Sequence, residues 1–255
     1  MNPACHDEEY EGGMDTDLKR GNEKSACHFM KSFTRCASNP NNNCRSMIPT
    51  VTLKCQAVRG NRDAQFRLGY RLAFSRNRAS RKREEAVKWW RRAAAQGHTR
   101  SQFYLGVSFD EGSGVRKNLK QAMFFYKKAA KAGHPEAQYN LAFGYREGEG
   151  VRKNQKLAAL WLFKCAALGD AEAQRDFGVC LFYGRGIRKN RVEAIRWYRK
   201  AAEQMDTKAQ YNLALAYNAG EVVRKDNAQA AKWFVAAAKQ GHIKARTWLK
   251  TAKAH

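Results

Sequence analysis

Residues of a kind that could bind phosphate recur at regular intervals along this 255-residue chain. The segment 114–118 reads GVRKN, and the pattern returns at 150–154 (GVRKN), at 186–190 (GIRKN) and, in weaker form, at 222–226 (VVRKD). A glycine followed by basic residues can hold a phosphate where the loop follows a strand and opens a helix. No strand is predicted before any copy, so the pattern favours a charged turn between helices. We call these four segments, each together with the two residues before it, the joints.

Most positions of a joint are explained by the helix that begins there. Asn and Asp are strong N-cap residues, and the glycines permit the tight turn between antiparallel helices. Three residues after the cap, three joints have Gln or Glu (Gln121, Glu193 and Gln229), which predicts a capping box with bonds in both directions. The predicted caps are Asn118, Asn154, Asn190 and Asp226.

The arginine of each joint has no part in such a turn and remains a candidate for binding. We expect the four to form a row along one edge, either as solvated charge or as a contact for an acidic protein or a phosphate backbone. A denser basic cluster at 76–83, RNRASRKR, is either a nucleic-acid patch, a localisation signal or an exposed connector. The predicted basic edge comprises Arg116, Arg152, Arg188 and Arg224 of the joints with Arg76, Arg78, Arg81, Lys82 and Arg83 of the cluster.

The joints belong to a longer repeat. Five glutamines, each followed by an apolar residue and then by Gly or Ala, are spaced 37, 36, 36 and 36 residues apart: Gln65, Gln102, Gln138, Gln174 and Gln210. Each unit continues with a pair of large apolar residues, a pair of small ones and, in four units, a glycine, where the fourth has Met205. Self-similarity at this period is typical of stacked helix pairs.

Both halves of a unit are predicted to be helical. In the third unit Ala158, Trp161, Leu162 and Cys165 lie at i, i+3, i+4 and i+7, which is one apolar stripe. The predicted fold is all-α, with five helix-turn-helix repeats over 61–244 between capping helices. The expected order is an N-terminal arm without helical period that is disordered or loosely ordered (1–47), a capping helix (48–60), repeats at 61–97, 98–133, 134–169, 170–205 and 206–241, and a second capping helix (245–255).

The pattern A-Q-x-x-L-G, then G-x-G-V-x-K-N/D, then A-x-x-W-Y-x-x-A-A-x-x-G resembles the Sel1-like repeat, a relative of the tetratricopeptide repeat. The resemblance covers about residues 61–242, and the first unit departs most because SRNRASRKRE replaces its joint. It implies a right-handed α-solenoid and a non-enzymatic adaptor that assembles proteins. One branch of the family is cysteine-rich and handles β-lactams. Here the repeats hold only Cys165 and Cys180, in different units, so that activity is not expected.

The resemblance also implies that the first helices of the repeats line a concave binding face. The position two after each glutamine is usually exposed there, and one turn further lies a second row. An asparagine in such a row can hold a peptide backbone with both a donor and an acceptor, although these positions would also suit plain solvated residues. The predicted face comprises Arg67, Tyr104, Asn140, Asp176 and Asn212 with Arg71 and Ser108, and the second row continues through Gly144, Cys180 and Ala216.

Metal binding, cofactors and catalysis are not predicted. His98, His134 and His242 each follow the residue that ends a helix and are interpreted as turn residues near helix C-termini. Outside the repeats, the cysteines and histidines suffice in number for zinc but match no C-x-x-C spacing: Cys5, His6, Cys27, His28, Cys36, Cys44 and Cys55. No nucleophile elbow or paired His-Glu motif is present in the sequence.

The charge of the chain is strongly positive and unevenly placed. With 48 Lys and Arg against 23 Asp and Glu the net charge is +25, of which residues 1–60 contribute +1 from eight basic and seven acidic residues. Such charge favours acidic partners. The lack of an apolar leader or membrane span predicts the cytoplasm, with signal-independent secretion as the alternative. The leading hypothesis is a protein-interaction scaffold that binds a protein or peptide with an acidic surface. A nucleic-acid-associated solenoid is the alternative, and a β-lactam-binding protein the second alternative.

Overall fold

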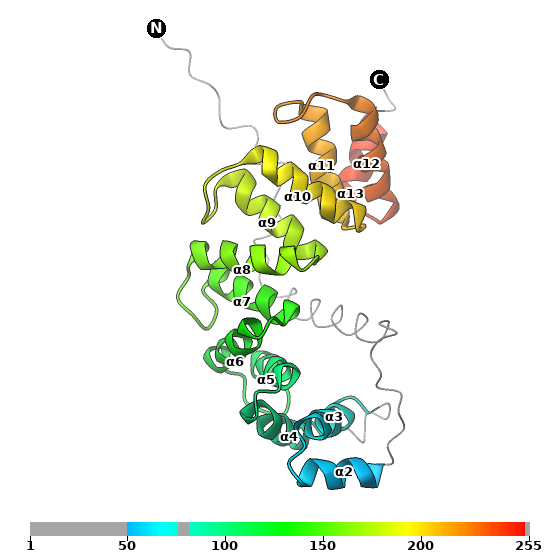
Figure 1. The fold of residues 1–255 in the computed structure, drawn as a ribbon. Helices are drawn as coiled ribbons and strands as arrows, with labels where there is room; N and C mark the ends of the chain where they lie inside the picture. The colour runs from blue at the N-terminus through cyan, green and yellow to red at the C-terminus, as the bar shows by residue number, and fades with distance from the viewer. Residues whose placement is uncertain (1–49, 76–81, 253–255) are drawn as a thin grey trace. The chain divides into compact units, whose positions relative to one another are not determined.

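The structure is a computed structural model that describes residues 50–75 and 82–252 (Figure 1). The chain divides into two units, Met1–Met47 and Ile48–His255, and all described residues belong to the second. The predicted N-terminal arm and the part of the basic cluster at 76–81 therefore lie outside the described residues.

The described part is an all-α repeat solenoid of twelve helices without a strand. Each helix packs against the next along the series, from α2 on α3 to α12 on α13. The helices are α2 (Thr50–Val58), α3 (Arg62–Ala73), α4 (Arg83–Ala95), α5 (Thr99–Glu111), α6 (Leu119–Lys131), α7 (Pro135–Glu147), α8 (Gln155–Ala167), α9 (Ala171–Tyr183), α10 (Arg191–Glu203), α11 (Thr207–Ala219), α12 (Asn227–Lys239) and α13 (Ile243–Ala252). Odd-numbered helices from α3 to α11 are the first helices of the five repeats, and even-numbered helices from α4 to α12 are the second.

The joints begin the second helices through their Asn and Asp side chains. Asn118 accepts a hydrogen bond from the backbone N–H of Gln121 at 3.1 Å, and Asn154, Asn190 and Asp226 do the same three residues on, at 3.0, 3.0 and 2.9 Å. The predicted capping box is wrong in its second half. The backbone N–H of each cap already donates to a carbonyl near the end of the preceding first helix, from Asn118 to Phe109 at 2.8 Å, so Gln121 has no donor to accept from.

The second helices end on a left-handed residue, which is glycine in four repeats. In the fourth repeat this residue is Met205, with a φ of 65°, and it is the one described non-glycine residue with positive φ. A left-handed conformation costs an ordinary residue about 1–2 kcal/mol. Met205 is 67% exposed and so gains little from packing. The helix therefore ends at the repeat boundary even where its preferred residue is missing.

The core matches small residues on the first helices to large ones on the second. A Cβ placed on Gly178 would lie 2.7 Å from the ring of Tyr198, and Gly69 and Gly106 meet Trp90 and Tyr126 in the same way. In the third repeat the large residue is the smaller Leu162, and Ala142 stands at the glycine position. The alternation of small and large residues therefore brings the helices of each pair close together.

The repeated glutamine joins each repeat to the one before it. Its side-chain amide donates to a carbonyl in the last turn of the preceding second helix, as from Gln138 to Ala130 at 3.2 Å. The other four make the equivalent bond, Gln65 to Ala57, Gln102 to Ala94, Gln174 to Ala166 and Gln210 to Ala202, at 3.0 to 3.4 Å. In three repeats the glutamine's own oxygen accepts from a second glutamine at the end of the following helix, Gln96, Gln204 or Gln240. The periodicity of the glutamine thus reflects a buried hydrogen bond between repeats.

The third repeat lacks that second glutamine, and restoring it is expected to stabilise the protein. Leu168 occupies the position and is 59% exposed, while the buried Gln138 Oε1 has no hydrogen-bond partner among the described residues. A hydrogen bond to a buried unpaired acceptor contributes about 1 kcal/mol, so we expect Leu168→Gln to raise the free energy of unfolding by about that amount. Urea unfolding monitored by circular dichroism measures it. The prediction would be contradicted if a Leu168→Ala variant were as stable as Leu168→Gln.

Candidate functional site

The predicted binding face is only partly open. Arg67 and Arg71 are exposed on α3, while Tyr104 and Asn140 are partly buried. The ring of Tyr104 lies among those of Phe66, Tyr70 and Trp90, with centroids 5.8, 5.8 and 5.1 Å away. Asn140 hydrogen bonds with the hydroxyl of Tyr126. The half of this face nearer the N-terminus thus combines exposed arginines with an aromatic and an amide side chain that are partly held by neighbouring residues.

The exposure expected for the rest of the face is wrong. Ser108 and Asn212 are buried, at 3% and 5% exposure, and Gly144, Cys180 and Ala216 are buried as well. The second row lies in the last turn of the first helix, where the joint folds back over it. There Ser108, Gly144, Cys180 and Ala216 accept backbone N–H groups from the joint through their carbonyls. Small side chains at these positions make room for the joint, and the Ser108 hydroxyl donates to the Tyr104 carbonyl at 2.8 Å.

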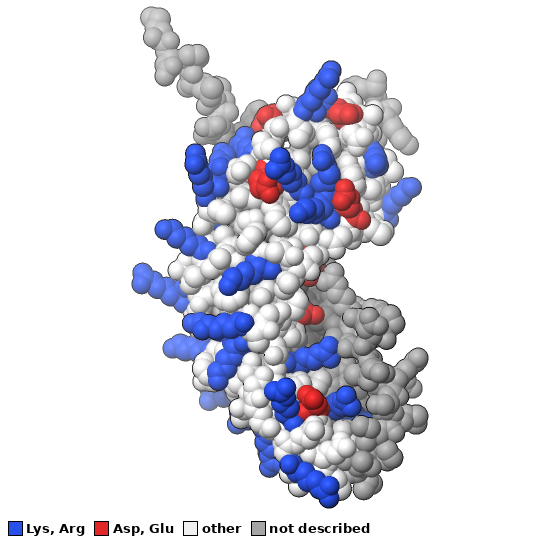
Figure 2. All heavy atoms as spheres, in the orientation of Figure 1, with Lys and Arg blue, Asp and Glu red and all other residues white. Residues whose placement is uncertain are grey.

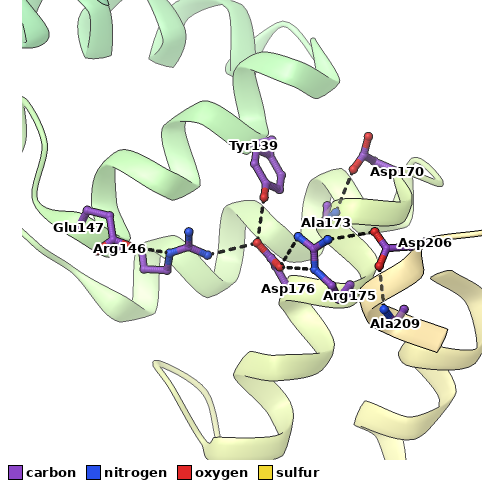
Figure 3. Close-up of polar contacts among 9 residues, drawn as sticks. All are labelled: Tyr139, Arg146, Glu147, Asp170, Ala173, Arg175, Asp176, Asp206 and Ala209. Carbon is purple, nitrogen blue, oxygen red and sulfur yellow. Dashed lines mark hydrogen bonds and ion pairs between the residues drawn. The ribbon is translucent and has the colours of Figure 1, made fainter. Parts of the chain in front are cut away.

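Asp176 is the centre of a buried charge network that joins three repeats (Figure 3). Its carboxylate accepts from the hydroxyl of Tyr139 at 2.9 Å and from Arg146 at 3.1 Å, both on α7. Arg175 beside it donates at 2.8 Å to the same carboxylate and at 2.9 Å to Asp206. Asp206 in turn caps α11 by accepting from Ala209 N–H at 2.7 Å. In this repeat the position two after the glutamine therefore faces the preceding repeat, which explains why Asp176 is covered.

The charges of this network are held firmly in place. Asp176 and Arg175 each keep 13% of their side-chain surface and Asp206 keeps 9%. Burial alone would raise the pKa of Asp176, but Arg175 and Arg146 hold it well below its usual range. Burial raises the pKa of Tyr139, and the Asp176 charge raises it further. Asp176 is therefore an ionised structural group with its acceptor sites filled, and we do not assign it to ligand binding.

The four joint arginines are at the surface of the described repeats. Arg116, Arg152, Arg188 and Arg224 are all exposed, and none forms an ion pair with a carboxylate in the described part of the chain. The lysine after each arginine has a different surrounding, because its backbone and Cβ pack against the first glycine of the joint. Among the described residues, the joint arginines are thus exposed cations with no carboxylate partner.

The described remainder of the basic cluster is also at the surface. Lys82 and Arg83 are exposed at the start of α4, where Lys82 lies 3.9 Å from Glu85. Arg76, Arg78 and Arg81 lie outside the described residues. Figure 2 shows Lys and Arg side chains along the side where the loops joining α7 to α8 and α9 to α10 lie in Figure 1, with few Asp or Glu among them. This side of the repeat array carries a strong positive charge.

A smaller acidic group interrupts the positive surface between the second and third repeats. Burial raises the pKa of Glu111 to about 7, with a further contribution from the neighbouring Asp110. Burial and the Asp110 charge also raise the pKa of Glu149 in the next joint. The positive charge of Lys117 in the joint lowers the pKa of both carboxyls. Glu111 therefore changes its charge near neutral pH.

The three repeat histidines follow the ends of second helices, as predicted, with each backbone N–H donating to a carbonyl of the last turn, and each also stands at the start of the next helix. Only a glycine separates the helices there, and the next residue already begins the following helix. His98 Nδ1 accepts from the Ser101 N–H at 3.1 Å, and His242 Nδ1 accepts from Ala245 at 3.2 Å. Each ring stacks on an aromatic ring of the preceding first helix, His98 on Phe66 at 4.7 Å, His134 on Phe103 at 4.4 Å and His242 on Tyr211 at 4.3 Å. A helix N-terminus disfavours a cation, and His98 accepts there through Nδ1, so this cap works as a neutral imidazole.

The histidine caps are expected to make stability fall in mild acid. Burial lowers the pKa of both His98 and His134, so the unfolded chain binds more protons than the folded one. Their contribution is therefore complete above the ordinary pKa of about 6.5 and is lost as pH falls below it, by at most about 1.4 kcal/mol per histidine and pH unit. A His98→Asn/His134→Asn variant keeps cap residues that do not titrate. Its unfolding free energy should fall less between pH 7.5 and 5.5 than that of the unchanged protein, and equal slopes would contradict the prediction.

The described part of the chain has neither a membrane span nor a metal cluster. None of its helices is long and apolar enough to cross a bilayer, and no three His, Cys, Asp or Glu side chains within it are placed to share an ion. Cys165 and Cys180 are buried free thiols, and Cys55 is exposed on α2. The other cysteines and histidines that would suffice in number for zinc (Cys5, His6, Cys27, His28, Cys36 and Cys44) lie outside the described residues.

Comparison with known proteins agrees with the repeat architecture. The family model described as Sel1 repeat matches five times, at 62–98, 99–134, 135–170, 171–205 and 207–242. A protective antigen of uropathogenic Escherichia coli that displays an SLR fold is 35% identical with a TM-score of 0.74, over 78% of this chain and 42% of that one. A Sel1 repeat protein from Oxalobacter formigenes is 31% identical with a TM-score of 0.69, over 78% and 79%. No curated protein matches the sequence.

This chain thus spans less than half of the E. coli antigen and about four fifths of the Oxalobacter protein. Both relatives share its all-α repeat solenoid, and the repeat matches cover most of the chain. Proteins built from Sel1 repeats are generally protein-interaction scaffolds. The chain belongs to the Sel1 repeat family.

Proposed function

We propose that this protein is a non-enzymatic scaffold that binds an acidic segment of a partner protein along the joint arginines and the adjoining first-helix face. The observation that carries the proposal is the row itself. Four arginines recur at one position of successive repeats, all exposed and none paired with a described carboxylate. Exposed like charges repel one another at close range, and no role in the joint requires them, so an acidic partner explains them best.

The first-helix face supplies the variation that a specific partner needs. Core positions keep the same residue types from repeat to repeat, whereas the position two after the glutamine changes from Arg67 to Tyr104 and Asn140. Arg67 is exposed, and the other two are partly so. A charged, an aromatic and an amide side chain in series favour a sequence-specific contact. We therefore place the N-terminal half of this face in the binding site and leave Asp176, Ser108 and Asn212 out of it.

The test compares two variants of equal charge. In the row variant Arg116, Arg152, Arg188 and Arg224 become alanine, and in the control Lys54, Lys88, Lys208 and Lys239, which are exposed elsewhere, become alanine. Each protein captures partners from a nuclease-treated lysate, and a captured partner is then purified and titrated. An exposed ion pair contributes about 0.5 kcal/mol, so losing four should weaken binding by about 30-fold.

Three results would contradict the proposal. One is that no protein is captured reproducibly by the unchanged chain. Another is that the control variant loses as much affinity as the row variant, because binding would then follow net charge alone. The third is that the row variant differs only in retained nucleic acid before nuclease treatment. That outcome would make the protein a nucleic-acid-associated solenoid.

A further inference from the structure

A second surface of the repeats combines lysines with exposed apolar side chains. Helices α6 and α8 are the second helices of consecutive repeats, and together they contain six lysines and no Asp or Glu. Phe124 on α6 is 50% exposed, and Leu160 and Phe163 on α8 are each 45% exposed. We call these three residues, with Lys127, Lys128 and Lys164 around them, the α6–α8 surface.

The apolar residues of this surface stand where other repeats carry charge. Phe124 and Leu160 occupy the same position of their helices, 36 residues apart, and the equivalents in the first, fourth and fifth repeats are Lys88, Arg196 and Lys232. Because the repeats stack in order, equivalent positions face the same side. Exposed apolar groups therefore gather on two neighbouring repeats, and a helix of the same kind folds well with a basic residue in their place.

The packing of these residues leaves a shallow patch with a fixed basic rim. Phe163 covers part of its ring against Phe177 and Trp197, with centroids 5.3 and 6.4 Å away. The ammonium of Lys128 lies 4.5 Å from the ring centre of Phe124, and that of Lys164 lies 4.4 Å from Trp161. Cation–π contact holds these charges beside the apolar groups. A partner must therefore offer apolar and anionic groups at the same time.

Charge and shape select one kind of partner. A second copy of this surface would bring lysines against lysines, and a nucleic acid would leave the apolar groups without a contact. A bilayer takes up apolar side chains that reach about 5–10 Å into it, whereas each apolar residue here is already half covered. An amphipathic helix can place an apolar ridge between α6 and α8 and carboxylates over the lysines. We propose that the α6–α8 surface is a docking site for an acidic amphipathic helix of a partner protein.

This site uses none of the residues assigned to the joint row. Its ligand needs apolar residues at helical spacing, whereas the row needs charge alone. A protein with both surfaces can hold two partners at once, which extends the scaffold role from binding to bridging.

The experiment selects the ligand and then removes the apolar anchors. A random-peptide display library is selected on the full chain with counter-selection on Phe124→Lys/Leu160→Lys, which installs the residue found at equivalent positions of α4 and α12. We expect enriched peptides to be acidic, with Leu, Ile or Phe at i, i+3 or i+4 spacing. Titration of such a peptide should show about 10-fold weaker binding to the variant, because two apolar contacts are lost. The added positive charge alone would strengthen the binding.

A matched control separates the patch from general charge. Val192→Lys/Val235→Lys adds two lysines at exposed valines of α10 and α12 and should leave peptide binding unchanged, as should the variant of the four joint arginines. Circular dichroism and thermal melting check that the variants remain folded. The proposal is overturned if no acidic amphipathic peptide is enriched, or if the α6–α8 variant binds the peptide as tightly as the unchanged chain. Binding to vesicles of phosphatidylserine and phosphatidylcholine and to single-stranded DNA is measured as well. The proposal is also overturned if either of these binds the α6–α8 variant and the unchanged chain with different affinity while the peptides do not.

Discussion

Replacing Gly186 with alanine is expected to lower the free energy of unfolding by about 3–4 kcal/mol. Gly186 is the second glycine of the third joint, with a φ of +74°. A Cβ at this position would overlap the backbone carbonyl of Gln155, the first residue of α8. Backbone cannot move aside as a flexible side chain does, so overpacking of about 1–3 kcal/mol adds to the left-handed penalty of about 1–2 kcal/mol.

A second glycine separates these two costs. Gly169 also has a positive φ, of +94°, but a Cβ there would have nothing within 4 Å. Gly169→Ala should therefore cost only about 1–2 kcal/mol, and the difference between the two variants measures the contact between the joint and α8. Urea unfolding gives both values, and hydrogen exchange should show the loss of protection centred on α8 to α10. If the two variants lost the same free energy of unfolding, the contact between the joint and the preceding repeat would contribute nothing to the loss.

The contact that Gly186 makes also shows how joints fix the stacking of repeats. Gly114 and Gly150 meet the first residues of α4 and α6 in the same manner. The last joint has Val222 at this position, and Val222 does not adopt a positive φ. The final joint therefore follows a different path from the other three, as the weaker form of its sequence suggests.

Much of the fold follows from the period of the sequence because each repeat solves the same packing problem. The spacing of Gln65 to Gln210 and the small residues after each glutamine predict paired, stacked helices. Where one helix ends and the next begins is harder to assign from the sequence. With a single glycine between helices, His98 follows one helix and begins the next, so composition alone does not tell a C-terminal from an N-terminal role.

The binding face could be predicted less well, for a physical reason. Whether Asp176 is exposed depends on Arg146, 30 residues earlier in the preceding repeat, and no rule within one repeat relates the two. A signal was present, since Arg175 stands where the other four repeats have Phe or Tyr, and Asp206 stands where three of the repeat boundaries have histidine. The α6–α8 surface cannot be recognised within a single helix, because Phe124 and Leu160 become unusual only beside Lys88 and Lys232 at the equivalent positions.

Removing Arg175 is expected to destabilise the protein by about 3–4 kcal/mol. The side chain joins Asp176 and Asp206, and its loss leaves Asp206, at 9% exposure, with no cation within ion-pair distance in the described part of the chain. Breaking one partner out of a buried charge network costs about 3–5 kcal/mol, whereas replacing the network as a whole is often neutral. We place Arg175→Ala at the lower end because Arg146 still pairs with Asp176.

The next repeat supplies the replacement. There Tyr211 and His242 stand at the positions of Arg175 and Asp206, and their rings stack at 4.3 Å while His242 caps its helix. Arg175→Tyr/Asp206→His should therefore recover most of the stability that Arg175→Ala loses. Because buried charges are little screened, the loss in Arg175→Ala should persist in high salt when measured by urea unfolding. If the double variant were as unstable as Arg175→Ala, ring packing and ion pairing would not be interchangeable between these repeats, and the network would be specific to the contact between the fourth and fifth.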